Sequence, residues 1–515
     1  MTELDEALEH HRAGRLQEAE ALYRRVLARE PDHADALHLL GVIAHQVGQH
    51  ENAVALIEQA VARNPDSPEY HNGLGEALHA LGQHDRALDA YGRACTLNPR
   101  YADAHCNRGI ALHAQGKLTD AVSAFEKAAA VSPDSAEAHY NLANVLHEVG
   151  EFERAVAAYQ VAIQRSPNDP DIYNNLGVAL ADQLKLNDAF AAFDQSLALQ
   201  PDFAQAHSNK GMALLLTGRF EEGWREYAWR MPWVEYKHIR TVRWDGQAFA
   251  GKTLLVHTEQ GIGDSIQFCR YLPMVKTRGG RVLLACQPAM QRLLQGLPGV
   301  DAWVGDPKTL SADVVFDFYC PLLNIPGLFD TKLESIPAEV PYLRVDPGLI
   351  ATWKQRIDPQ RYNVGLCWAG RPTNRNDQNR STTLAAFAPL ARANGVVFYS
   401  LQKGVATEQA AHPPAGMTFV DITSELNDFA DTAALIANLD LVIAVDTAVA
   451  HLAGALAKPV WVVLTYCADW RWLLDREDSP WYPTMRLFRQ PHPGDWDAPM
   501  QRVAGELVRA TSRAR

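Results

Sequence analysis

The sequence predicts an α-helical solenoid of repeats, followed by an α/β region of two Rossmann-like lobes. Two observations carry this prediction. Proline recurs every 34 residues through the first half of the chain, at positions 31, 65, 99, 133, 167 and 201. After about residue 250, short apolar runs alternate with helical segments, which is typical of parallel α/β folds.

The repeats are defined by further rows of residues at the same spacing. Small residues occupy one row: Gly41, Gly75, Gly109, Ala143, Gly177 and Gly211. Large apolar residues occupy another: Tyr23, Ile57, Tyr91, Phe125, Tyr159, Phe193 and Tyr227. A second glycine row, at positions 14, 48, 82, 116, 150 and 218, is broken by Leu184. These rows resemble the tetratricopeptide repeat, a helix-turn-helix unit with small residues where helices touch. We predict about seven units over residues 1–237, ending in an aromatic stretch, WREYAWRMPW, that caps the solenoid.

One row of the solenoid predicts a binding groove. Asparagine recurs at positions Asn107, Asn141, Asn175 and Asn209. A ladder of amides can bond an extended peptide backbone without reading its sequence, and here the chain resembles the protein O-linked N-acetylglucosamine transferases. This resemblance implies a protein or peptide acceptor held in the repeat groove. The alternative is that each asparagine bonds only its neighbours.

Histidine also follows the repeat, with rows that include His71, His105 and His139 and, separately, His45, His79 and His113. Neighbours in a row come from successive repeats, so a row is not a compact set of metal ligands. We predict packing or groove roles for them and no metal site.

Composition excludes several classes of partner and site. The net charge is −13 and the sequence pI is about 5.8, which argues against nucleic acid or an anionic membrane as the main partner. No signal peptide or transmembrane segment is expected from the acidic, amphipathic start and the short apolar runs. The seven cysteines are scattered without a C-x-x-C pair, so we expect free thiols and a cytoplasmic location.

The second half is predicted to form two lobes joined by a Pro-rich linker at 336–347, with an N-terminal lobe over 238–345 and a C-terminal lobe over 346–515. Strands are expected at 253–258, 281–286, 302–305 and 314–319 in the first lobe. In the second they are expected at 364–370, 396–402, 418–423, 439–447 and 459–464.

Three segments carry a family resemblance: HTEQGIGDSIQFCRYLP (257–273), GLCWAGRPTNRNDQNRST (365–382) and VDTAVAHLAGALAKPVWVVL (445–464). They resemble family 9 glycosyltransferases, the heptosyltransferases, over about residues 250–500. The arrangement is similar to bacterial tetratricopeptide-repeat proteins fused to such a domain, including flagellin glycosyltransferases. The resemblance implies the GT-B fold, with an acceptor-binding first lobe and a nucleotide-sugar-binding second lobe, and it implies catalysis without a metal.

The donor site is expected where the strand ending at 445 gives way to a helix. The amides of Thr447 and Ala448 would face the diphosphate, because helix N-termini favour anions. By resemblance, Asp446 and His451 would contact sugar, ribose or phosphate, and their alternative roles are an N-cap and a packed histidine. By resemblance to the same families, Arg380, Gln402 and Lys403 are further donor-binding candidates, and the alternative for Arg380 and Lys403 is a solvated surface charge.

The turn HTEQGIGD resembles a phosphate loop but departs from both common patterns. Ile266 replaces the third glycine of a dinucleotide fingerprint, and no Gly-Lys-Ser/Thr follows. We therefore expect Asp264 in this turn to be the general base that takes the acceptor's proton. Glu259 is a rival base and His257 a weaker one. An N-cap role is compatible with that of a base.

The aromatic segment 469–483 is expected to be structural, as a crossover by which the C-terminal segment returns to the first lobe, with a sugar-stacking wall as the alternative. Together these features predict a metal-independent glycosyltransferase that moves sugar from a nucleotide-sugar donor, without a further cofactor, to a protein. The alternatives are a glycan or lipid-linked acceptor, as in the heptosyltransferases, and an inactive repeat scaffold.

Overall fold

The computed structural model describes residues 2–230, 242–373 and 376–513. The chain divides into two compact units, Met1–Phe203 and Ala204–Arg515. The predicted end of the solenoid at residue 237 lies outside the described residues. The predicted lobe boundaries remain predictions.

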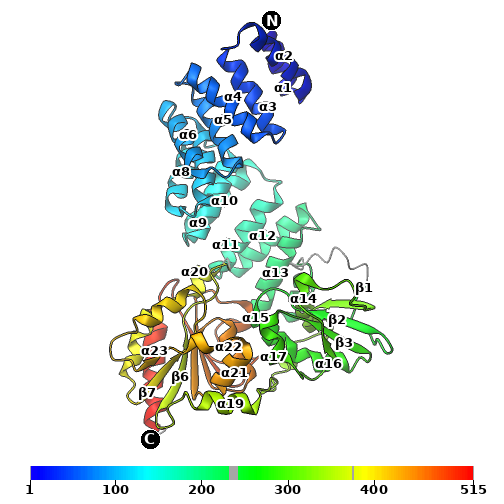
Figure 1. Ribbon diagram of the computed structural model, residues 1–515, viewed down its shortest axis with the longest axis vertical. Coiled ribbons are helices and arrows are strands. Elements are labelled where there is room, and N and C mark those ends of the chain that lie inside the picture. Colours follow the sequence, from blue (N-terminus) through cyan, green and yellow to red (C-terminus); the bar gives the residue numbers. More distant parts are fainter. Residues whose placement is uncertain (1, 231–241, 374–375, 514–515) are drawn as a thin grey trace. The chain divides into compact units, whose positions relative to one another are not determined.

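The first unit is a stack of antiparallel helix pairs, and a seventh pair, α13 and α14, belongs to the second unit (Figure 1). The helices are α1 (Glu3–Arg12), α2 (Leu16–Arg29), α3 (Ala34–Gln46), α4 (His50–Arg63), α5 (Pro68–Ala80), α6 (His84–Leu97), α7 (Ala102–Ala114), α8 (Leu118–Val131), α9 (Ala136–Glu148), α10 (Phe152–Arg165), α11 (Pro170–Asp182), α12 (Leu186–Leu199), α13 (Ala204–Leu216) and α14 (Phe220–Tyr227). The predicted α-helical repeat solenoid is confirmed.

Both glycine rows have a steric cause. A Cβ added at Gly75 would lie 2.5 Å from Cε1 of Tyr91, so the small-residue row is where paired helices touch. The second row ends the first helix of each pair with positive φ, as at Gly48 (φ +79°), which glycine adopts without strain. Leu184 breaks this row but keeps its backbone, with φ +57°. The repeat therefore imposes a left-handed residue even where the side chain opposes it.

The second unit contains two parallel sheets, as predicted. The first has the order β1-β5-β2-β3-β4 and the second the order β11-β10-β9-β6-β7-β8. Their strands are β1 (Val242–Arg243), β2 (Thr253–His257), β3 (Arg281–Ala285), β4 (Ala302–Trp303), β5 (Phe318–Pro321), β6 (Tyr362–Cys367), β7 (Val396–Ser400), β8 (Phe419–Val420), β9 (Leu441–Val445), β10 (Val460–Leu464) and β11 (Met485–Arg489). The α/β fold class with two lobes is confirmed. Strands β1 and β11 were not predicted, and β5 overlaps only the end of its predicted range, 314–319.

Helices cover these sheets. They are α15 (Ile262–Phe268), α16 (Leu272–Lys276), α17 (Gln291–Leu294), α18 (Ile325–Leu328), α19 (Pro347–Lys354), α20 (Asp377–Arg380), α21 (Phe429–Ala437), α22 (Ala448–Ala455) and α23 (Asp497–Arg513). Across the described residues, none of the helices has the length and apolar character needed to cross a membrane.

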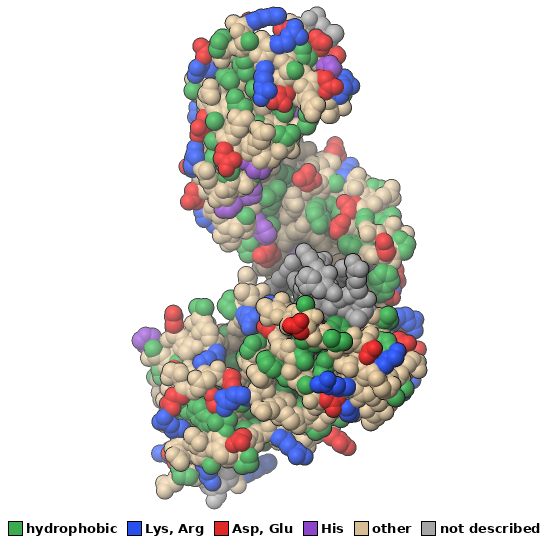
Figure 2. Space-filling model, turned by 45° about the vertical axis from the view of Figure 1, so that its right-hand side comes forward, with side chains coloured by type: hydrophobic (Ala, Val, Ile, Leu, Met, Phe, Trp, Pro, Cys, Tyr) green, Lys and Arg blue, Asp and Glu red, His purple; other side chains and the backbone are tan. Residues whose placement is uncertain are grey.

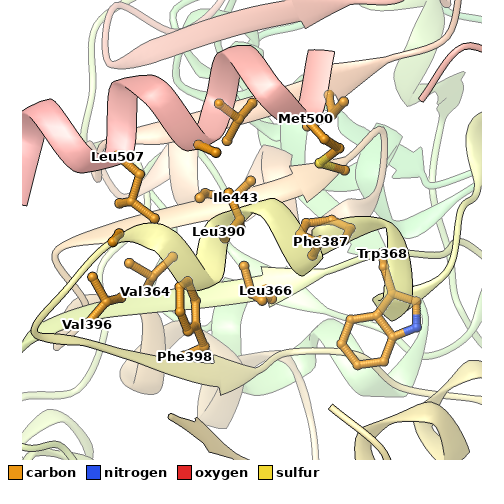
Figure 3. Packing of buried hydrophobic residues seen from close by; sticks show 14 of the residues in the cluster. Val364, Leu366, Trp368, Phe387, Leu390, Val396, Phe398, Ile443, Met500 and Leu507 are labelled. Atoms are coloured by element: carbon orange, nitrogen blue, oxygen red, sulfur yellow. The ribbon is translucent and has the colours of Figure 1, made fainter. Parts of the chain in front are cut away.

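The C-terminal helix α23 packs on the six-stranded sheet, and the predicted return of this segment to the first lobe is wrong. Met500 and Leu507 of α23 meet Leu390 of a 3-10 helix (Leu384–Arg392) and Ile443 of β9 in one buried cluster (Figure 3). Burying such side chains contributes about 1.5–3 kcal/mol each, which holds α23 to this lobe.

Candidate functional site at the helices α15 and α22

The turn after β2 builds the first half of the site. Gly261 is the N-cap of α15, and its N–H donates to Asp264 Oδ2 at 2.8 Å. This bond is the second half of a capping box, in which the side chain of the third helical residue accepts from the backbone amide of the N-cap residue. The N-cap role expected for Asp264 is therefore wrong, because Gly261 holds that position and Asp264 is the third helical residue; the Asp264 side chain remains 18% exposed.

Gly263 brings this turn into backbone contact with α22. A Cβ at Gly263 would lie 2.9 Å from Cδ2 of His451 and 3.5 Å from Cα of Ala448. Helix α15 follows a strand of one sheet and α22 a strand of the other, so this contact joins the two lobes. The glycine is needed for close approach of a second helix.

The second half of the site begins at the end of β9. Thr447 is the N-cap of α22 with extended backbone (φ −141°), but its side chain makes no capping bond. Its Oγ1 instead faces Cys367 Sγ at 3.6 Å. The first amides of α22, from Ala448 onward, therefore lack a side-chain cap, which is the condition for an anion to bind there.

Asp446 and His451 lie at the same end of α22. His451 is buried, stacks on Trp472 at 5.2 Å, and its Nδ1 is 3.0 Å from Tyr482 Oη. Burial, and then the nearby cation of Arg471, hold the pKa of His451 well below its ordinary value, so the ring is neutral. Its Nε2 lies 3.9 Å from Asp446 Oδ1. Burial and the charge of Asp469 raise the pKa of Asp446 to about 6.

Arg380 reaches this turn from α20. Its Nη1 donates to the carbonyl oxygen of Asp446 at 3.2 Å, and its Nε to Asp377 Oδ1 at 3.2 Å. The structure thus brings together Arg380, Asp446 and the N-terminus of α22, as the donor-site prediction requires. Arg371, in the loop that precedes α20, is exposed.

Gln402 and Lys403 have structural partners. The Gln402 side chain accepts from the amides of Trp368 and Ala369 at 3.0 and 2.8 Å. Its Nε2 donates to the carbonyls of Ala369 and Lys403. Lys403 Nζ donates to the carbonyls of Thr423 and Leu426 at 2.7 and 3.1 Å. Direct donor contact by either remains a prediction, and for Gln402 it would require these backbone bonds to break.

Arg471 is the site residue that sequence reasoning missed. Its Nη2 forms an ion pair with Asp264, its Nη1 donates to Asp469 Oδ1 at 2.7 Å, and its guanidinium lies over the Trp470 ring at 4.4 Å. Burial raises the pKa of Asp264, and the Arg471 cation opposes this rise. The sequence feature that could have identified Arg471 is its position inside the aromatic run DWRW. Aromatic runs are commonly buried, and a buried charge needs a partner of opposite charge.

The remainder of segment 469–483 packs against both lobes. Trp470 stacks on Phe268 of α15 at 6.2 Å and meets Trp224 of α14 edge-on at 5.3 Å. Trp224 also donates to the carbonyl of Thr331 at 2.8 Å. The segment therefore has a structural role, and the aromatic stretch at α14 packs on the α/β lobes.

The rival bases are less accessible than Asp264. Glu259 is 3% exposed and forms an ion pair with Arg230, and burial raises its pKa. His257 has no exposed surface, and burial lowers its pKa to about 4. An acceptor hydroxyl can approach Asp264 with less rearrangement than either.

The asparagine row makes bonds between successive repeats. Asn107 Nδ2 donates to Asn72 Oδ1 at 3.2 Å and to Glu76 Oε1 at 2.9 Å. Asn175 Nδ2 donates to Tyr140 Oη and Asn144 Oδ1 at 2.9 and 3.0 Å. Asn141 is half-buried. Asn209 is 9% exposed and lies in the second compact unit. Neighbour bonding, the alternative role, is thus present, and peptide binding stays a prediction.

Histidine side chains gather on the solenoid (Figure 2). His71, His105 and His139 each place Nε2 near the carbonyl of the preceding inter-repeat proline, at 2.8–3.2 Å. Over residues 2–230, 242–373 and 376–513, no group of three or more His, Cys, Asp or Glu is arranged to hold a metal. The row has a packing role.

Comparisons with known proteins agree with the two-part organisation. Residues 10–77, 75–116, 106–170 and 174–227 match tetratricopeptide repeat families. Residues 383–471 match glycosyltransferase family 9 (heptosyltransferase). The predicted combination of these repeats with a family 9 domain is confirmed. The family 9 match contains Gln402, Asp446, His451 and Arg471, whereas Asp264 precedes it.

A curated relative is Protein FlbA of Caulobacter vibrioides (strain ATCC 19089 / CIP 103742 / CB 15), which is 31% identical over 326 residues. The match covers 57% of this chain and 53% of FlbA, so the chain spans about half the length of that relative. Similar solved structures include TTC0263, a tetratricopeptide-repeat protein of Thermus thermophilus (27% identity, 35% of this chain and 97% of that one, TM-score 0.31). Another is pilF of Pseudomonas aeruginosa (21% identity, 40% and 93%, TM-score 0.37).

Proposed function

We propose that this chain, which joins tetratricopeptide repeats to a family 9 glycosyltransferase domain, transfers a sugar from a nucleotide-sugar donor to a protein. The observation that carries the proposal is the contact at Gly263. It sets a carboxylate, Asp264, at the start of α15 beside the uncapped N-terminus of α22 with Asp446 and Arg380. A base and an anion site are the two parts that sugar transfer needs.

In this proposal the donor diphosphate binds at the first amides of α22. The helix N-terminus and the Arg380 guanidinium supply positive charge to the leaving group as the bond from the anomeric carbon to its phosphate oxygen breaks. This charge takes the place of a bound metal. Asp446 accepts hydrogen bonds from the sugar or ribose, and neutral His451 orients the group beside it.

Asp264 acts as the base on the acceptor. The hydroxyl oxygen of the acceptor attacks the anomeric carbon while its proton passes to the Asp264 carboxylate. The Arg471 cation favours the ionised form of this carboxylate and opposes the burial that raises its pKa, and Asp469 shares the Arg471 charge. The protein acceptor would lie along the asparagine row of the repeats, with Asn107 and Asn175 exchanging their present partners for a peptide backbone that Asn141 also contacts.

The base assignment is tested with Asp264→Asn. The variant keeps the oxygen that caps Gly261 and loses the basic carboxylate. We expect sugar transfer to fall at least about 100-fold, in line with loss of a general base, while nucleotide sugars still raise the melting temperature. A control is Asp346→Asn, because Asp346 also accepts a backbone bond at the start of a helix, as the N-cap of α19 that accepts from the Leu349 amide at 2.9 Å.

Two outcomes would contradict the assignment. Unchanged transfer by Asp264→Asn would exclude Asp264 as the base. Loss of donor-induced stabilisation together with transfer would make it a donor-binding or structural residue.

The acceptor assignment is tested by replacing the asparagine row with alanine. Changing Asn107, Asn141, Asn175 and Asn209 together should weaken transfer to protein but leave hydrolysis of the nucleotide sugar unchanged. The control changes Asn64 and Asn98, which end α4 and α6, to alanine. Unchanged transfer by the fourfold variant would show that this row does not hold the acceptor.

A further inference from the structure

A pocket in the first unit departs from the repeat that surrounds it. It has a volume of about 470 Å³ and lies among α6, α7 and α8. Its lining includes Gly92, Cys95, His105, Arg108, Lys127 and Val131. The repeat supplies an internal standard, because each of these positions has counterparts 34 residues away in the other units.

The first departure removes an acid from the pocket wall. Gly92 stands where three other repeats have the acids Glu58, Glu126 and Asp194, and the remaining three have Arg24, Gln160 and Ala228. A Cβ at Gly92 would meet nothing within 4 Å, so no packing contact requires the glycine. Glycine costs about 0.5–1 kcal/mol relative to alanine inside a helix. Glycine at position 92 therefore lowers the stability of helix α6 and leaves the pocket wall open at this point.

In the second departure, a cation that has no acidic partner among the described residues stands in a mainly apolar row. Arg108 stands where four other repeats have Leu40, Leu74, Leu142 and Leu176; the first repeat has Glu6, and the seventh has Lys210, which lies 3.6 Å from Glu226. These leucines pack between helices, and three of them are less than a tenth exposed. A half-buried guanidinium at such a position needs an anionic partner to offset its lost hydration.

The third departure replaces an ion pair with two positive charges. In the preceding repeat, Arg93 Nη2 lies 3.3 Å from Asp66 Oδ1. The corresponding positions hold Lys127 and Arg100, so an attractive pair becomes a pair of like charges. Other repeats keep the acid at this position, as Asp32 and Asp134, and both form ion pairs with arginine.

The resulting cations lack carboxylate partners. Within the described part of the chain, Arg100, Arg108 and Lys127 form no ion pair, whereas Arg63, Arg86, Arg93, Arg154 and Arg165 all do. Burial raises the pKa of the Cys95 thiol, and Arg108 and Lys127 both oppose that rise. Both cations therefore act on the same wall of the pocket.

His105 adds an unsatisfied polar atom. It is 5% exposed, and its Nε2 lies 3.1 Å from the carbonyl oxygen of Pro99, so Nε2 carries a proton. Its Nδ1 is buried and finds no hydrogen-bond partner in the described structure. With the proton on Nε2, Nδ1 is an acceptor, and a backbone N–H of a bound polypeptide would supply its missing hydrogen bond.

We propose that this pocket binds an acidic segment of a partner polypeptide, with a carboxylate between Arg108 and Lys127 and an adjoining apolar side chain against Val131 and Cys95. A single phosphate ion would leave most of the volume empty. Apart from the buried His105, the lining offers no aromatic ring on which a nucleotide base could stack. Asn107 does not line the pocket, so this is a second protein-binding surface and its existence does not depend on the proposed transfer.

The test uses the full-length chain and variants that restore the repeat. Arg108→Leu, Arg100→Asp and Gly92→Glu each install the residue that sister repeats carry, so all three should remain folded. The probe is a fluorescein-labelled peptide rich in glutamate with isolated leucines, and its control has glutamine in place of glutamate. Arg165→Leu removes a solenoid arginine outside the pocket and is the matched control.

We expect the acidic peptide to bind, with affinity that falls as salt rises, and Arg108→Leu to weaken it about 10-fold, the loss of one charge-assisted contact. Arg165→Leu and Asp264→Asn should bind as the unmodified chain does. Equal binding of the glutamine peptide, or no effect of Arg108→Leu, would overturn the proposal. Displacement of the peptide by millimolar inorganic phosphate or ADP would make the pocket a small-anion site instead.

Discussion

The repeat solenoid and the α/β lobes differ in how readily an unusual residue can be recognised from the sequence. Each solenoid position has counterparts in sister repeats, so a departure such as Arg108 or Leu184 is visible against the chain's own pattern. A residue of the α/β lobes has no internal counterpart. No pattern in the sequence indicates that Arg471, which lies among aromatic residues, forms an ion pair with Asp264. Internal repetition thus identifies unusual residues without any second sequence, and a single-copy fold needs the structure.

We expect the largest effect from a substitution at Gly263, where α15 of one lobe contacts α22 of the other. Gly263→Val would place side-chain atoms where Cδ2 of His451 lies only 2.9 Å from a Cβ, forcing α15 away from α22. A displacement of about 1 Å at a reaction centre can cost about 100-fold in rate. We expect a loss of that size in sugar transfer, measured per folded molecule. Gly505→Ala in α23, whose Cβ has only Arg509 Nη2 within reach at 3.8 Å, is the control. Full activity in Gly263→Val would show that the contact is not part of the site.

The next test compares two glycines of the solenoid. Gly75→Ala places a Cβ 2.5 Å from Tyr91, and overpacking of this kind costs about 1–3 kcal/mol. Gly92→Ala meets open space and should stabilise the helix by about 0.5–1 kcal/mol. Chemical denaturation of both variants measures the difference. Equal effects would mean that the small-residue row does not set the helix contacts.

The fold was more predictable than the site. The 34-residue rows determine the helix pairs, and parallel strands follow from apolar runs, whereas the two-residue strand β1 has too little pattern to find. For the site, the grouping of Arg380 with Asp446 was anticipated from a resemblance. The Arg471 ion pair depends on a segment that is 207 residues from Asp264 in sequence, and no local spacing reports such a contact. The bonds of Gln402 and Lys403 to backbone carbonyls were equally invisible.

Substitution of Asp446 should change the free energy of unfolding by a smaller amount that depends on pH. Its pKa is about 6 against an ordinary 3.8, so the folded state binds the extra proton and loses stability as pH rises from about 4 to 6. Asp446→Asn removes this penalty. Because the side chain is 17% exposed, we expect a gain of only about 1–2 kcal/mol at pH 7.5, and little at pH 4. Urea unfolding at the two pH values checks this, and a gain of equal size at both would contradict the raised pKa.

We expect the smallest effect on stability from a substitution at Leu184 in the repeat solenoid. Leu184 holds a left-handed conformation that costs about 1 kcal/mol or more for a residue with a Cβ. Leu184→Gly should therefore stabilise the solenoid slightly, and the reciprocal Gly150→Leu should destabilise it by a similar amount. Thermal unfolding distinguishes the two directions. Destabilisation by Leu184→Gly would mean that the leucine side chain contributes packing that outweighs the strain.

The most direct test of the central claim is a melting-temperature measurement on the full-length chain with ADP, UDP, GDP, CDP and dTDP and the corresponding nucleotide sugars. We predict that at least one base type raises the melting temperature of the α/β unit, as binding to the native state must. Arg380→Gln should reduce that rise. No shift with any nucleotide or nucleotide sugar would contradict a donor site at α22 and would favour a scaffold without transferase activity.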